Sequence, residues 1–202
     1  MSHDVQAQAP AQGTQCSDPS DGNFSACWLR EPDSNDVDDV ATWLAEPEIN
    51  QWFDFGQGRQ TLPVLAVRLM MQSDRHRLRV FGPAGHEVAS GLVAVSDLAH
   101  AFGTASFWVL RDSRRAACRD MTFLASIGLL RETFDTHRLH CITAWAVECN
   151  VRSRRLLERI GFRAIGLQRN CHIVRGSRFG RVLYDLLPAD LANGPIPAGG
   201  DA

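Results

Sequence analysis

The sequence predicts an α/β (α+β) fold of one domain, with its elements in the order β-α-α-β-β-β-α-β-α-β-β. Apolar runs of strand length alternate with segments in which apolar residues recur at helical spacing. The chain has 202 residues, 45% of them hydrophobic, so it can bury one substantial core. No internal repeat or linker divides it, and no apolar run approaches the roughly 20 residues that a membrane span requires.

Two helices are predicted in the first third of the chain. Asp36 can cap the first helix, because a carboxylate at a helix start accepts hydrogen bonds from amides of the first turn. The apolar face of this helix carries Val40, Trp43 and Leu44. Thr61 starts the second helix, with Pro63 just inside it, where a missing N–H is tolerated. The residues of this helix that we expect in the core are Leu65, Val67, Leu69 and Met70.

Three strands and a longer helix follow. Strands over 77–81 and 88–96 are joined by the segment 82–85, which reads Gly-Pro-Ala-Gly and is a turn by composition. The next strand covers 103–110. The helix covers 122–134, and the residues that it turns toward a core are Leu124, Ile127, Gly128 and Leu130.

The most informative stretch comes next. An apolar strand, 142–147, leads into Asn150 and a short amphipathic helix, which Gly161 ends before Phe162 begins another strand. A turn that parts two strands leaves main-chain groups of the first strand unpaired. Asn150 offers an amide donor and a carbonyl acceptor, so it can hold an extended, amide-bearing ligand there. Ser153 lies one helical turn on and faces the same gap.

The run from Asn150 through Ser153 to Gly161-Phe162 resembles the signature of the GNAT acetyltransferase superfamily. Residues 28–32 and 46–52 look like the opening strand and acceptor-side helices of its RimJ/RimL branch, which acetylates protein amino termini and small amines. The resemblance spans roughly residues 28–191. It implies the GNAT fold, a mixed and mostly antiparallel central sheet flanked by helices, and a GNAT domain over residues 26–192.

One loop departs from the family pattern. Relatives place a glycine-containing loop between the fourth strand and the next helix, where main-chain amides bind the pyrophosphate of coenzyme A. The corresponding residues here, 111–120, include no glycine. Arginine side chains present charged forks to phosphates, so we expect Arg114, Arg115 and Arg119 to replace the main-chain donors.

The resemblance implies an N-acyltransferase that moves an acetyl group from acetyl-CoA to a primary amine by direct attack in a ternary complex. Main-chain groups of Val109 and Leu110 would align the pantetheine arm, and Asn150 would anchor it. Ser153 would assist departure of the thiolate, although a role as a local cap stays open. Leu157 occupies the position where many relatives carry a general-acid tyrosine.

The acceptor, a small-molecule amine or a peptide amino terminus, is not specified by the sequence. Two other functions stay open. The glycine-free loop and the basic residues Arg152, Arg154 and Arg155 also suit an acyl or aminoacyl donor on a carrier protein or tRNA. Alternatively, the chain is a binding module that kept the fold and lost the chemistry. Four tryptophans are expected in the core or in a pocket wall: Trp43, Trp52, Trp108 and Trp145.

Composition limits the remaining possibilities. The formal net charge of -2 gives no global attraction to nucleic acid. The six cysteines form no Cys-x-x-Cys pair and no zinc-like spacing with histidine, so we expect no metal and a reducing cytoplasm. Residues 1–25 are expected to be a disordered extension without a secretion signal, and residues 193–202 a flexible tail.

Overall fold

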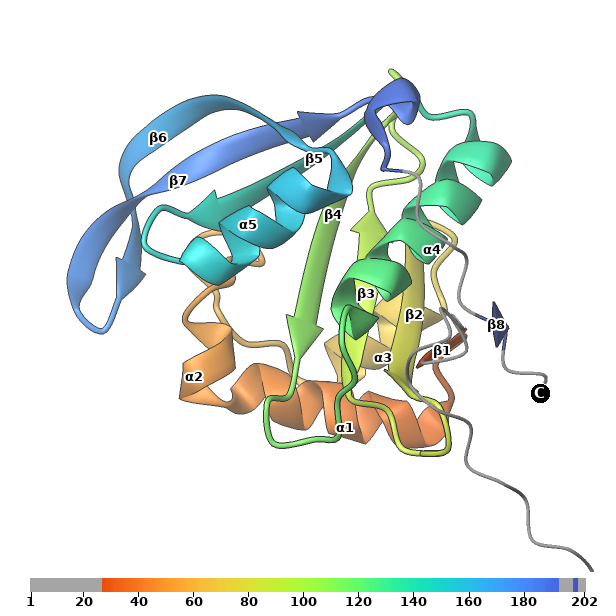
Figure 1. The fold of residues 1–202 in the computed structure, drawn as a ribbon. Coiled ribbons are helices and arrows are strands. Elements are labelled where there is room, and N and C mark those ends of the chain that lie inside the picture. The colour runs from red at the N-terminus through yellow and green to blue at the C-terminus, as the bar shows by residue number, and fades with distance from the viewer. Residues whose placement is uncertain (1–26, 193–197, 200–202) are drawn as a thin grey trace, which may run out of the picture.

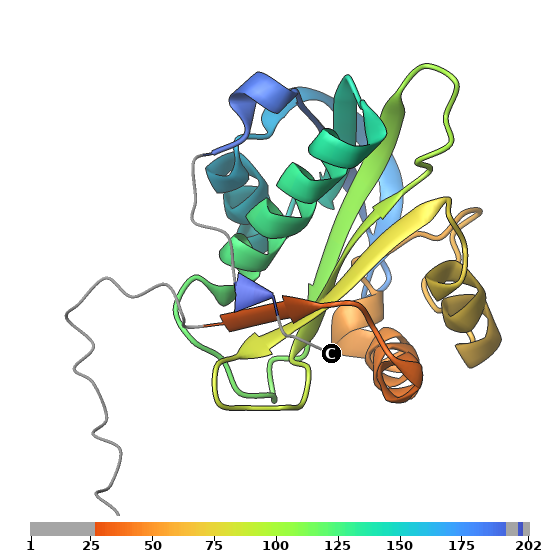
Figure 2. The ribbon, with the colours of Figure 1, turned by 90° about the vertical axis from the view of Figure 1, so that its right-hand side faces the viewer.

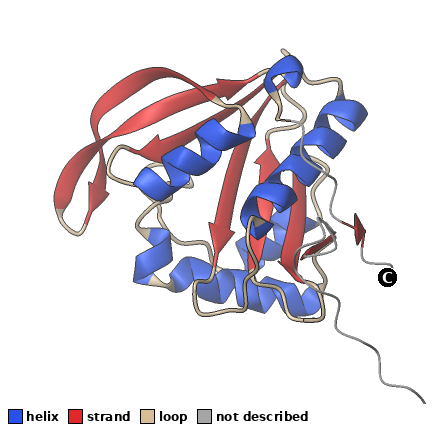
Figure 3. Cartoon of the chain, in the orientation of Figure 1, coloured by secondary structure: helices blue, strands red, loops and turns tan. Residues whose placement is uncertain are grey.

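The computed structural model describes residues 27–192 and 198–199. The extension expected at residues 1–25, and the expected tail apart from residues 198–199, lie outside the described residues. Helices and strands alternate along the described chain largely as predicted (Figure 3). The helices are α1 (Ser34–Ala45), α2 (Pro47–Asn50), α3 (Val64–Met71), α4 (Met121–His137) and α5 (Val151–Ile160). The strands are β1 (Cys27–Arg30), β2 (His76–Pro83), β3 (Gly91–Ser96), β4 (Thr104–Arg111), β5 (Cys141–Val147), β6 (Arg163–Val174), β7 (Ser177–Leu186) and β8 (Ala198–Gly199).

All the strands join one sheet, in the order β6-β7-β5-β4-β3-β2-β1-β8 (Figure 1). Neighbouring strands are antiparallel except for β4 with β5 and β1 with β8. Helices α4 and α5 cover one face of the sheet, and α1, α2 and α3 lie on the other (Figure 2). The predicted fold, a mixed and mostly antiparallel sheet flanked by helices, is therefore confirmed. Within the described residues, no helix has the length and apolar character to cross a membrane.

The parallel pair β4 and β5 separates soon after it forms. Only three residue pairs are in register, from Thr104 with Cys141 to Ser106 with Thr143. Beyond them the two strands diverge, as Figure 1 shows. The main-chain groups of β4 that face β5 after Ser106 therefore have no strand partner, and unpaired main-chain groups are ready to bind a ligand.

Two hydrophobic cores lie on opposite faces of the sheet, and β4 contributes to both. Phe107 packs in the core beneath α4 and α5, and Val109 lies against it. Leu110 packs in the core beneath α1 and α3, with Trp108 against it. This alternation follows from the two-residue period of a strand. Successive side chains of β4 therefore point alternately to the two faces of the sheet.

The start of α1 differs from the prediction. Asp33, not Asp36, is the cap, and its carboxylate accepts hydrogen bonds from the amides of Asn35 and Asp36. Asp36 completes the capping box by accepting from the Asp33 amide at 2.8 Å. Aspartate suits both positions, so composition alone does not distinguish the cap from the residue three positions later. The predicted apolar face, Val40, Trp43 and Leu44, is buried.

Helix α3 starts at Val64, so Thr61 does not begin it, and Pro63 is the cap rather than the first helical residue. Val67 is buried, but Leu65 and Leu69 are 65% and 57% exposed. Residues two apart lie on opposite sides of a helix, so this set could not share one face. The predicted helix at 122–134 is confirmed as α4, with its core-facing residues buried.

Candidate active site

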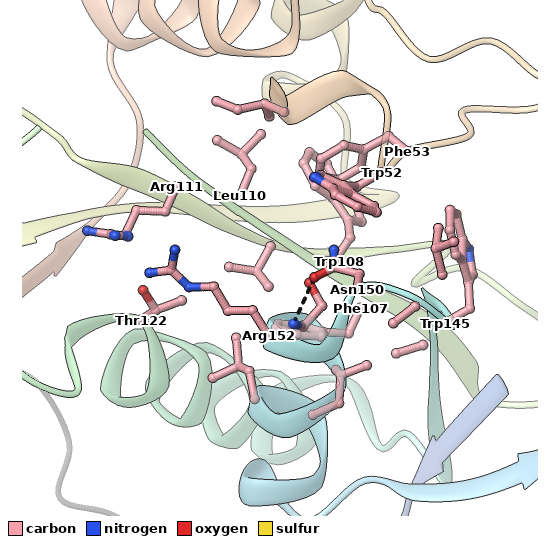
Figure 4. A pocket seen from close by; sticks show the side chains of 18 of the residues that line it. Trp52, Phe53, Phe107, Trp108, Leu110, Arg111, Thr122, Trp145, Asn150 and Arg152 are labelled. Atoms are coloured by element: carbon pink, nitrogen blue, oxygen red, sulfur yellow. Dashed lines mark hydrogen bonds between the residues drawn. The ribbon is translucent and has the colours of Figure 1, made fainter. Parts of the chain in front are cut away.

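A cavity of about 930 Å³ opens where β4 and β5 separate. Its wall is formed by the second halves of β4 and β5, the first turns of α4 and α5, and the segment between α2 and α3 (Figure 4). Because it includes Phe107 and Val109 from one face and Trp108 and Leu110 from the other, the cavity passes through the gap in the sheet. Two reactants could therefore meet there from opposite faces.

Asn150 lies in this wall, at the start of α5 (Figure 4). It is the helix cap, and its side-chain oxygen accepts a hydrogen bond from the Ser153 amide at 3.1 Å. Its amide nitrogen has no protein partner in the described part of the chain. The fold uses the acceptor half of the side chain, so only the donor half remains for a ligand.

Ser153 also lines the cavity, and its hydroxyl makes no hydrogen bond to another described residue. Leu157 lies in the same wall one helical turn further on and is buried. Tyr184, the sole tyrosine, is fully buried and is not in the cavity wall. Its hydroxyl lies near Arg154 and donates to Glu158 at 3.3 Å. Among these residues, Ser153 is the hydroxyl that faces the cavity.

The three arginines expected to bind phosphate do not line the cavity. Arg114 holds Asp112 through two hydrogen bonds, of 2.9 and 3.0 Å, and also pairs with Glu46. These bonds, more than the opposing effect of burial, hold the pKa of the Asp112 carboxyl below its usual value.

Arg115 and Arg119 are placed differently from each other. The Arg115 guanidinium donates to Asp39 of α1 at 2.9 Å. The Arg119 side chain is 96% exposed and lies 3.7 Å from Asp120. The structure thus brings Asn150, Ser153, Val109 and Leu110 together around the cavity, and separates these arginines from it.

Three other arginines line the cavity, and no pattern in the sequence distinguishes them from the arginines of the loop: Arg111, Arg152 and Arg155. Among the described residues, none of them forms an ion pair with a carboxylate. Burial and the neighbouring charge of Arg152 lower the pKa of Arg111, while Asp112 acts in the opposite direction. Figure 4 shows Arg111 and Arg152 on the same side of the cavity as Thr122, in the first turn of α4. Two unpaired guanidinium groups in one place favour an anion.

The first turn of α4 lies at the same end of the cavity as Arg111 and Arg152 and adds to the positive charge there. The helix has 17 residues, and the side chain of its cap, Asp120, accepts no hydrogen bond from the first turn. That carboxylate pairs instead with Arg159, at 2.5 Å. The amides of the first turn therefore remain available, and the helix dipole favours negative charge beside them. Arg111, Arg152 and this helix end therefore place positive charge and free amide donors at the same end of the cavity.

The opposite end of the cavity is aromatic. Its lining includes Trp52, Phe53, Phe55, Trp108 and Trp145, which we call the aromatic wall. Figure 4 shows the positions of the three tryptophans and of Phe53. Trp52, Trp108 and Trp145 were expected in the core or a pocket wall, and they lie in this wall, whereas Trp43 is buried in the core. The two phenylalanines were not singled out, because residues 53–55 follow a four-residue helix that gives them no periodic pattern.

Known proteins share the fold of this chain. The family model of the acetyltransferase (GNAT) domain matches residues 27–163. The spermidine N-acetyltransferase from Vibrio cholerae, solved with CoA and spermine, superposes with a TM-score of 0.69 at 16% identity, over 82% of this chain and 98% of that one. Mycobacterium smegmatis RimJ, solved with CoA-disulfide, gives a TM-score of 0.64 at 19% identity, over 84% and 86% of the two chains. The sequence matches no curated protein. Because the family model covers more than half of the chain and the fold agrees, the chain belongs to the GNAT acetyltransferase family, as the motif at Asn150 predicted.

Proposed function

We propose that this protein transfers an acetyl group from acetyl-CoA to a primary amine by direct attack in a ternary complex. The observation that carries the proposal is the single cavity through the sheet, which has an arginine-rich end, unpaired main chain in the middle and an aromatic end. The two neighbours solved with CoA or CoA-disulfide support coenzyme A as the carrier of the acyl group.

The donor is bound along β4. The pantetheine arm is an extended chain with two amides, so it pairs with the free main-chain groups of Val109 much as a strand would. The main-chain groups of Leu110 face β3 instead, because the amide of Asp112, two residues on, donates to the Ser90 carbonyl beside that strand. The amide nitrogen of Asn150 donates a hydrogen bond from the other side of the gap. Arg111 and Arg152 bind the pyrophosphate in place of a glycine-rich loop. The same role for Arg114, Arg115 and Arg119 stays a prediction, although two of them already hold carboxylates.

The reaction needs little from the protein beyond positioning and charge stabilisation. The neutral amine attacks the thioester carbonyl, and a main-chain amide of β4 donates to the oxyanion that forms. When the C–S bond breaks, the thiolate of coenzyme A receives a hydrogen bond from Ser153. The proton of the attacking amine leaves through water.

The proposal is tested by measuring the binding of acetyl-CoA, coenzyme A and an acylated carrier protein to the purified chain by calorimetry. Mass spectrometry then follows acetylation of a mixed panel of amines. We expect binding of both coenzyme A species and acetylated products. If the chain binds no coenzyme A but accepts an acyl group from a carrier protein or aminoacyl-tRNA, that molecule is the donor and acetyl-CoA is not. Binding of acetyl-CoA without any product would identify a binding module.

A further inference from the structure

We infer that the acceptor is a primary amine attached to an aromatic or bulky apolar body, and not a polyamine. This inference rests on the proposed function, because it names the acceptor of that same site. It comes from the aromatic wall and from the state of the carboxylates beside it.

Three rings of the aromatic wall pack against one another. The rings of Phe53 and Phe55 lie parallel, with centroids 5.5 Å apart. Both meet the ring of Trp108 edge-on, at 5.9 and 5.8 Å. Trp108 precedes Val109 on β4, the strand along which we place the donor. The apolar surface therefore begins beside the reacting centre, where the group next to the amine would lie.

Two carboxylates at this end of the cavity, Glu48 and Asp54, are paired with arginines. Both oxygens of Glu48 accept from Arg175, at 3.0 and 2.9 Å. Asp54 accepts from Arg181 at 2.7 Å and from the amides of Gly56 and Gly58, each at 2.9 Å.

Among the described residues that line the cavity, Asp97 is the remaining carboxylate at the aromatic end, and it is exposed. A polyamine carries a positive charge every few carbons and needs a matching row of unpaired carboxylates. One exposed aspartate does not supply that row, whereas five aromatic side chains supply a surface for an apolar body.

The aromatic wall is also held in place before any ligand binds. Asp54 lies between the two phenylalanines in the sequence, and its ion pair with Arg181 ties this segment to β7. The Arg181 guanidinium lies 4.1 Å from the centre of the Trp145 ring and donates to Nδ1 of His172. His172 in turn bonds the carbonyl of Gln51 at 2.8 Å. A wall fixed in this way loses little entropy when an apolar ligand binds against it.

The test compares kcat/KM for acetylation, with the full chain and acetyl-CoA, of 2-phenylethylamine, ethylamine and spermidine. Two tripeptides, Phe-Gly-Gly and Ser-Gly-Gly, are compared with these amines. They show whether the preferred acceptor is a small-molecule amine or a peptide amino terminus. We expect 2-phenylethylamine or Phe-Gly-Gly to exceed ethylamine, Ser-Gly-Gly and spermidine by about 100-fold, because an apolar pocket discriminates by roughly 10–200-fold per added group.

Phe55→Ala should lower kcat/KM for the preferred aromatic substrate by about tenfold or more, and that for ethylamine by less, so that the preference for the aromatic substrate narrows. Phe102→Ala is the matched control, since Phe102 is 79% exposed and does not line the cavity. If the alanine variant does not fold, Phe55→Leu is used instead. It keeps an apolar side chain, so we expect a smaller loss of kcat/KM for the aromatic substrate.

The outcomes separate the two claims. Acetylation of spermidine or ethylamine as fast as the aromatic amines overturns the inference and leaves the proposed function intact. An unchanged preference in Phe55→Ala overturns the inference in the same way. If no amine or peptide is acetylated, the proposed function fails and the inference fails with it.

Discussion

The side-chain oxygen of Asn150 accepts a hydrogen bond from the main-chain amide of Ser153, with 3.1 Å between the two atoms. The two residues that define the family motif are therefore joined in the first turn of α5 before any ligand binds. Asn150 caps the helix with its oxygen and keeps its amide nitrogen for the cavity. Because the oxygen serves the helix and the nitrogen is left for the ligand, the structural role of Asn150 and its proposed binding role can be tested separately.

Asn150→Ala should weaken acetyl-CoA binding by about 1–3 kcal/mol, because a buried hydrogen bond to the donor is lost. It should also destabilise the chain by roughly 1 kcal/mol through loss of the cap. Asn150→Asp keeps an oxygen at the cap and removes the amide donor, so it should weaken binding without lowering the melting temperature. Calorimetry and thermal unfolding measure the two effects. Wild-type affinity in both variants would leave Asn150 as a cap only.

Ser153→Ala should lower the rate of acetyl transfer more than it lowers donor affinity. A hydrogen bond to the departing thiolate grows only in the transition state, so its loss appears in the chemical step. We expect a decrease of about tenfold or more in single-turnover experiments. The helix cap is unaffected, because it uses the main-chain amide of Ser153. A chemical step as fast as that of the wild type would assign the hydroxyl no catalytic role.

Replacing both Arg111 and Arg152 with glutamine should weaken binding of coenzyme A much more than binding of a pantetheine thioester, which has no pyrophosphate. The binding that remains should also depend less on salt, because fewer charges face the phosphates. Calorimetry at two ionic strengths checks both expectations.

The matched variant replaces Arg114, Arg115 and Arg119 with glutamine. It should keep more of the coenzyme A affinity but unfold at a lower temperature, because Asp112 is buried and would lose its partners. A larger loss of affinity in the triple variant than in the double variant would show that Arg114, Arg115 and Arg119 bind the phosphates, as the sequence predicted.

The sequence identified the family and the motif because both depend on local order: a strand, Asn150, a short helix and Gly161. It did not identify which arginines face the cavity, because that depends on partners far along the chain. Arg115 meets Asp39, which lies 76 positions earlier. Arg114 meets Glu46 at the end of α1. A basic loop looks the same in the sequence whether its charges are free or already paired, so only the fold distinguishes Arg111 from Arg114.

The ring of His172 predicts how the stability of the chain changes with pH. It is buried, Nδ1 accepts from Arg181, and Nε2 bonds the carbonyl of Gln51. Burial, and next the charge of Arg181, lower the pKa of His172, while the bond to Gln51 and the charge of Asp54 oppose them. A protonated ring could no longer accept at Nδ1, so the fold requires the neutral form.

Stability should therefore fall as the pH decreases below about 6.5, the pKa of histidine in an unfolded chain, because the unfolded state then binds a proton that the folded state excludes. The loss of stability should level off once the pH passes below the lower pKa of His172 in the folded state.

His172→Gln removes the titrating ring and keeps a polar side chain. We expect the wild type to be more stable than the variant at pH 7.5, and the difference to narrow toward pH 5. Thermal unfolding of both chains across this range measures it, and other titrating groups, such as His76, cancel in the comparison. A difference in melting temperature that stays constant from pH 7.5 to pH 5 would show that His172 has no such role.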